Sequence, residues 1–148
     1  MSITLAQAFG KISAGELPEV ALIEFTRGFF QTELDELRFS LIAEAPAAMA
    51  DKRLDALAGA VGEYLAKHYR LPTVPGWVTE PGRYLDHPWH VMIFNDGRDR
   101  RLPKSDAGLR EFLTFSSPAE FCSRNIFTDA MPFAPYDLRH WQKSRSSQ

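Results

Sequence analysis

Residues 51–69 read DKRLDALAGAVGEYLAKHY, and this stretch decides the fold because it carries the clearest helical pattern of the chain. Asp51 is of a type that caps helix N-termini, and apolar residues then recur every three or four positions. The predicted buried face comprises Leu54, Leu57, Val61, Leu65 and Tyr69. Small residues at intervals of four, Ala58, Gly62 and Ala66, form a stripe that would let another helix approach closely.

Three shorter helices are predicted ahead of this one. Ser2 is expected to cap the first, and Gly15 suits its end. Pro18 is placed for the first turn of the second, which is apolar on more than one side and is therefore expected to be central. Thr32 is expected to cap the third, which should not continue through Pro46. The apolar residues of this third helix that follow helical spacing are Leu34, Leu37, Leu41 and Ile42.

The chain changes character after residue 70. Four prolines and two glycines between residues 71 and 88 predict extended or turn structure, interrupted by one short helix around 82–85. The aromatic residues of this segment are too apolar for a free linker, so we expect it to wrap on the helical body. Residues 91–94 predict a short strand before the Asn-Asp-Gly turn at 95–97, and residues 97–104 a polar, exposed loop.

Short helices are predicted for the last part of the chain. Ser117-Pro118-Ala119-Glu120 signals a helix start, with Ser at the cap and Pro in the first turn. Phe121 is expected to point inward and Asn125 to end this helix. The overall prediction is a mainly α fold, a single-domain helical bundle with an irregular Pro/Trp-rich segment and one short strand or hairpin. Its parts over 1–148 are a helical body (1–70), a Pro/Trp-rich wrap and basic loop (71–105), short C-terminal helices (106–143, the last over 135–143) and a tail (144–148).

Composition excludes several classes of protein. The chain has 148 residues and 17 basic against 19 acidic side chains, a net charge of −2, so it lacks the basic excess of a protein that coats nucleic acid or anionic lipid. No apolar run approaches the ~20 residues of a membrane span. The N-terminus lacks the basic and apolar regions of a signal peptide, so we expect a cytoplasmic protein. Cys122 is the single cysteine, which excludes an internal disulfide and a Cys-cluster zinc site.

Catalytic and metal-binding motifs are missing from the sequence. No two of the four histidines have the i, i+4 spacing of a helical zinc motif. Asp86, His87 and His90 form a local cluster, for which a simple turn is the alternative interpretation. Cys122 is expected to be a small buried thiol. No nucleophile elbow, phosphate-binding glycine loop or dinucleotide fingerprint occurs, so we predict no catalytic residue, no metal and no cofactor.

The aromatic and arginine residues of the second half suggest a partner surface. Core packing explains most of these aromatics, yet Trp, Tyr and Arg also dominate the hot spots of protein–protein interfaces. Residues 98–104 hold four basic side chains against one acidic, 4 − 1 = +3, which fits a solvated loop or a contact with phosphate or an acidic partner. A partner surface needs no catalytic residues.

Several motifs together resemble a bacterial family of small uncharacterised proteins. They are Leu71-Pro72-x-x-Pro75-x-Trp77, Pro81-x-Arg83-Tyr84-Leu85-Asp86-x-Pro88-Trp89, Ser117-Pro118-Ala119-x-Phe121 and Arg124-Asn125-Ile126-Phe127. Some relatives carry a helix-turn-helix DNA-binding domain ahead of this region, and others are the small partner beside a nucleotidyltransferase-like toxin. The likeness covers roughly residues 5–130.

The resemblance implies an antitoxin-like protein that binds and neutralises a cognate toxin encoded by the adjacent gene. The residues expected to bind this partner are Arg83, Trp89, Arg98, Arg101, Arg124 and Phe127. For Arg124 and Phe127 the alternative is a structural role in fixing the turn after the short helix. A DNA-associated regulatory module is the second hypothesis, although residues 1–74 carry 7 basic and 10 acidic side chains, 7 − 10 = −3, which argues against DNA contact there. An enzyme of unknown type is the third.

Overall fold

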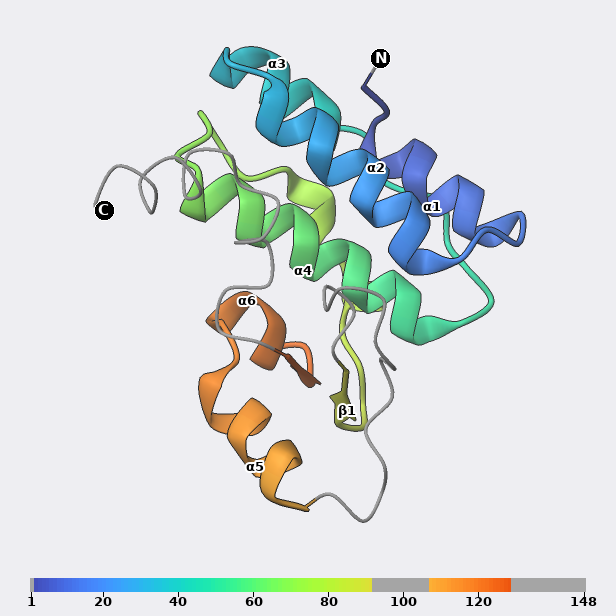
Figure 1. Cartoon of the computed structure of the whole chain (residues 1–148), viewed down its shortest axis with the longest axis vertical. Helices are drawn as coiled ribbons and strands as arrows, with labels where there is room; N and C mark the ends of the chain where they lie inside the picture. The colour runs from blue at the N-terminus through green and yellow to red at the C-terminus, as the bar shows by residue number, and fades with distance from the viewer. Residues whose placement is uncertain (1, 92–106, 129–148) are drawn as a thin grey trace, which may run out of the picture.

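The computed structural model describes residues 2–91 and 107–128 and confirms the predicted mainly α fold. Two 3₁₀ turns and a pair of short strands join the helices (Figure 1). The helices are α1 (Leu5–Ser13), α2 (Pro18–Gln31), α3 (Asp35–Ile42), α4 (Lys52–His68), α5 (Ala107–Ser116) and α6 (Ala119–Cys122). The turns are η1 (Gly76–Thr79) and η2 (Pro81–Arg83), and the strands are β1 (Trp89–His90) and β2 (Ile126–Phe127). The predictions for residues 92–106 (most of the strand, the turn and the basic loop) and for residues 129–148 (the last helix and the tail) lie outside the described residues.

Helix α4 is the centre of the structure. Helices α1 to α3 lie on one side of it, and α5, α6 and β1 lie on the other (Figure 1). Eleven of its 17 residues are buried, so it is covered nearly all round, whereas the periodicity predicted one buried face. Helix α2, which was expected to be central, belongs to an outer layer, and Val20 on it is half exposed.

The small residues of α4 were predicted to let another helix pack closely. In the structure it is the 3₁₀ turn η1 that packs there. A Cβ atom placed on Gly62 would lie 2.9 Å from Cγ1 of Val78 and 3.0 Å from Cη2 of Trp77, both in η1. The Trp77 indole also contacts the end of α3, where its Nε1–H donates to the carbonyl oxygen of Ile42 at 2.9 Å. The Pro/Trp-rich segment therefore wraps on the helical body, as predicted, and the glycine makes this close approach possible.

The cap of helix α1 lies two residues later than the sequence suggested. Thr4, not Ser2, is its cap: the Thr4 hydroxyl accepts the Gln7 backbone N–H at 3.0 Å, and Oε1 of Gln7 accepts the Thr4 N–H at 2.8 Å. Ser2 instead packs against Gly28 of α2, where an added Cβ would lie 2.9 Å from the Ser2 hydroxyl oxygen. The prediction for Gly15 is confirmed, because its φ of 112° follows the end of α1.

The third helix is also capped differently from the prediction. Thr32 ends α2 rather than capping α3, and its hydroxyl donates to the carbonyl oxygen of Gly28 at 2.7 Å. Leu34 stands at the N-cap of α3 without a side-chain hydrogen bond. Pro18 is the first residue of α2, as predicted.

The C-terminal elements are held together by a parallel pairing of β1 with β2. β2 was not predicted, and β1 begins two residues before the predicted strand. Ser117 does not cap α6; its hydroxyl oxygen accepts the backbone N–H of Thr128 at 2.8 Å, and Pro118 is the N-cap. Phe121 is fully buried, as predicted. The short helix ends earlier than predicted, at Cys122, and Asn125, with a φ of 65°, lies in the turn that follows it.

Candidate functional site

The six residues expected to bind a partner fall into three different environments. Two are buried, two are partly exposed, and two lie outside the described residues. In that order they are Arg83 and Arg124, Trp89 and Phe127, and Arg98 and Arg101. The structure therefore places Arg83 and Arg124 inside the protein, where a partner cannot contact them.

Arg124 is a structural clamp between α4, α6 and η1. Its side chain is fully buried, and its guanidinium donates to Oε1 of Glu63 at 2.8 Å and to the carbonyl oxygens of Glu120 and Val78 at 2.7 and 2.6 Å. The ring of Tyr84 covers it, with 4.7 Å between Cζ and the ring centroid. These contacts use most of the donors of Arg124, which supports the structural alternative for this residue.

The carboxyl group of Glu63 is tuned by this clamp. Burial alone would raise its pKa, but the hydrogen bond and the positive charge of Arg124, together with those of Lys67, hold the pKa of Glu63 below its ordinary value of 4.5. Lys67 Nζ lies 3.3 Å from the second carboxylate oxygen. Glu63 is therefore ionised at neutral pH and compensates the buried guanidinium.

Arg83 forms a second clamp, beside the first and nearer the start of α4. Its guanidinium donates to the carbonyl oxygen of Pro46 at 2.8 Å and lies 3.8 Å from Oδ1 of Asp55. The same carboxylate oxygen accepts the backbone N–H of Met49 at 2.9 Å, and the guanidinium lies 4.9 Å from the ring centroid of Trp77. Arg83 thus fixes the loop before α4 to the wrap that follows it.

Trp89 and Phe127 do not form one surface. Trp89 pairs with Ile126 and His90 with Phe127, and neighbouring side chains on a strand point to opposite faces. Trp89 lies under the guanidinium of Arg53 at the start of α4, with 5.4 Å to the ring centroid. Phe127 stacks on the His90 ring on the other face, at 5.0 Å between centroids. The strand pair separates the two aromatics that the sequence suggested for one interface.

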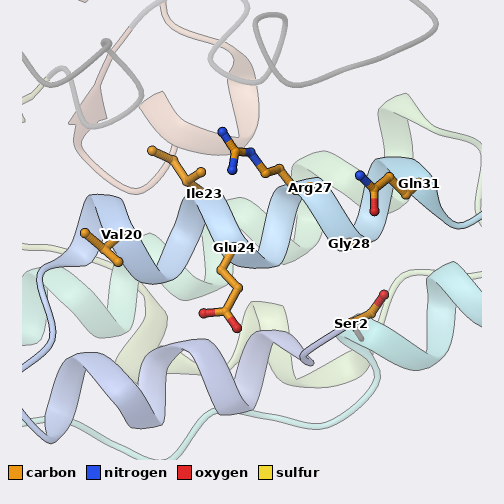
Figure 2. A pocket seen from close by; sticks show the side chains of 7 residues that line it. All are labelled: Ser2, Val20, Ile23, Glu24, Arg27, Gly28 and Gln31. Carbon is orange, nitrogen blue, oxygen red and sulfur yellow. The ribbon is translucent and has the colours of Figure 1, made fainter.

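An open surface of the described residues lies elsewhere, along α2. A groove of about 490 Å³ runs there, lined by Ser2, Val20, Ile23, Glu24, Arg27, Gly28 and Gln31. Figure 2 shows Ile23 and Arg27 projecting together away from α1, while Glu24 points toward α1. There the Glu24 carboxylate accepts two hydrogen bonds from Nζ of Lys11, at 2.9 and 3.1 Å. These bonds raise the pKa of Lys11 above its ordinary value of 10.5.

Exposed aliphatic side chains flank α2 at both ends. Their exposed fractions run from 47% to 64%, whereas the other Leu, Ile and Val side chains whose surroundings the structure describes are buried or partly buried. They are Leu17 and Val20 at the start of α2, and Leu34 and Leu37 at the start of α3. The helical spacing of Leu34 and Leu37 indicates only that they share a face of α3, not whether another element covers that face.

Other kinds of site find no support in the described residues. Within 2–91 and 107–128, no three His, Cys, Asp or Glu side chains are grouped closely enough to hold a metal ion. In the same ranges no helix has both the length and the apolar character needed to cross a membrane. Comparisons with protein-family models, with curated proteins and with solved structures found no match to this chain.

Proposed function

We propose that this protein is a non-enzymatic, cytoplasmic antitoxin that binds and neutralises a cognate toxin. The observation that carries the proposal is the set of exposed aliphatic side chains at the two ends of α2, beside an open groove. Such exposed aliphatic side chains offer a protein partner apolar area to bury. The choice of a nucleotidyltransferase-type toxin, encoded by the adjacent gene, rests on the motif resemblance.

The residues of the motifs that carry the resemblance have a structural role that is consistent with this proposal. Arg83, Trp77 and Arg124 tie the wrap to α4, so they supply the rigid scaffold that a binding surface needs. A rigid surface binds more tightly because less conformational entropy is lost on association. The aromatic and arginine residues would then support the partner surface from inside while α2 and α3 present it.

Co-expression with the adjacent open reading frame tests the proposal. We expect affinity purification to yield a stable complex, with a mass equal to a whole-number combination of the two chains, and co-expression to restore growth. Replacing Leu17 and Val20 together by Ser should weaken the complex, because it removes exposed apolar surface without disturbing the buried core.

The matched control is Phe115→Ser, which removes a large side chain that is 82% exposed on α5, on the other side of α4. It should leave the complex intact. Recovery of the chain alone, with no rescue of growth, would contradict the antitoxin function. Salt-dependent binding to DNA in that case would favour the regulatory alternative.

A further inference from the structure

The geometry points to one occupant of the α2 groove, an acidic amphipathic helix of the partner protein. This inference rests on the proposed function and names the part of the partner that the groove would recognise. It follows from three features of the groove: the spacing of its residues, its uncompensated charge, and its asymmetry along α2.

The spacing of the lining residues suits a helix packed along α2. Val20, Ile23, Arg27 and Gln31 follow one another at intervals of three, four and four residues, so they share one stripe of the helix. A helix can lay its own stripe of side chains along such a row. An extended peptide would gain less, because the backbone groups of α2 are already paired within the helix and offer no ladder of hydrogen bonds.

The charge of the groove is positive. The Arg27 side chain is exposed, lines the groove, and makes no hydrogen bond or ion pair with any other part of the chain that the structure describes. The neighbouring Glu24 is already compensated by Lys11. A guanidinium in this position favours a carboxylate on the occupant, because charge-assisted, bidentate pairs of this type are the strongest available to it.

The groove is asymmetric, which argues against a second copy of this chain as the occupant. Its first half is apolar, with Val20 and Ile23, and its second half is polar, with Arg27 and Gln31. Two antiparallel copies of α2 would place the apolar half of each against the polar half of the other. Two parallel copies would bring both Arg27 side chains together, and like charges at that distance repel. A partner helix with aliphatic residues at one end and a carboxylate at the other matches both halves.

The first test uses the complex with the adjacent gene product. We expect Arg27→Glu to weaken the complex about tenfold or more, since it opposes a like charge to the partner carboxylate. Arg27→Lys keeps the charge but not the bidentate geometry, so it should weaken the complex less. The matched control is Arg70→Glu, the same charge change at an exposed position after α4. A complex that forms and tolerates Arg27→Glu as well as it tolerates Arg70→Glu would refute the groove as the docking site and leave the antitoxin function standing.

The second test needs no toxin and decides the case in which no complex forms. Two helical peptides with the same leucine stripe, one flanked by glutamate and one by lysine, are titrated into the isotopically labelled full chain. We expect the glutamate peptide to shift the backbone amide resonances of Val20, Ile23 and Arg27, and the lysine peptide to leave them in place. Equal shifts from both peptides, shifts located only outside α2, or self-association through α2 without peptide would each overturn the inference.

Discussion

Replacing Gly59 by Ala should destabilise the protein, although the same change stabilises most helices. Gly59 lies in the middle of α4 at the point where both arginine clamps meet it. A Cβ atom there would lie 2.8 Å from Cβ of Arg83, 3.0 Å from Nε of Arg124 and 3.1 Å from the carbonyl oxygen of Val78. None of these atoms is the free end of a flexible side chain, so the turns must move away from the helix.

The magnitude follows from two opposing effects. Alanine in place of glycine favours a helix by about 0.5–1 kcal/mol, because glycine loses more backbone entropy on folding. Overpacking of a filled site costs about 1–3 kcal/mol. Moving Val78 also weakens its carbonyl's 2.6 Å hydrogen bond from Arg124, and bonds to charged groups contribute about 1.5–3 kcal/mol each when lost completely. We expect the free energy of unfolding to fall by about 2 kcal/mol, with overpacking as the main cause.

Gly10→Ala is the matched control. Gly10 lies in α1, is exposed, and has no atom within 4 Å of an added Cβ, so only the helix-favouring effect applies and stability should rise by about 1 kcal/mol. Urea unfolding followed by circular dichroism measures both variants, and the midpoints should move in opposite directions at an unchanged slope. If Gly59→Ala stabilises the protein as much as Gly10→Ala does, the close approach of the wrap to α4 is wrong.

Three further predictions concern the clamps and the first helix. Arg124→Met should lower the free energy of unfolding by about 3 kcal/mol, because the partly buried Glu63 carboxylate and two carbonyl oxygens lose the hydrogen bonds of the guanidinium. Urea unfolding of Arg124→Met, Glu63→Met and the double variant measures the coupling between the two residues, and additive losses would contradict it. Because the folded-state pKa of Glu63 lies below its ordinary 4.5, its contribution to stability is present above that pH and is lost as pH falls through the lowered value. Thermal unfolding between pH 7 and about 3 should therefore show a smaller acid loss in Glu63→Gln than in the unchanged protein, and parallel curves would argue against the pair. Thr4→Ala should destabilise by about 1 kcal/mol through loss of the cap, whereas Ser2→Ala should change the same unfolding midpoint little; the reverse order would restore Ser2 as the cap.

Much of the secondary structure could be predicted because it depends on local chemistry. Pro18 sets the start of α2, Gly15 and Asn125 adopt positive φ at helix ends, and Asp51 caps α4 with its side chain. Where two residues could each cap a helix, the type of the capping residue alone does not decide between them. Ser2 and Thr4 are both suitable caps, and Gln7 decides in favour of Thr4 by completing the capping box.

The candidate site could not be predicted in the same way. Arg83, Arg124 and Trp89 have the composition of an interface hot spot, but composition does not distinguish an arginine that meets a partner from one that meets the protein's own carbonyl groups. The only sequence signal for the α2 groove is weak: Arg27 and Gln31 follow Val20 at helical spacing. Periodicity alone assigns such polar residues to a solvated face.

Local patterns were enough to predict the four longest helices, the wrap over the helical body and the mainly α class, because spacing and prolines act within a few residues of one another. Only the tertiary structure decided that α4 is central, that η1 rather than a helix fills the small-residue stripe, and that Leu34 and Leu37 remain exposed. The physical reason is that burial depends on which distant segment covers a surface. Arg124, for example, receives its partners from Glu63 and Val78, 61 and 46 residues away along the chain.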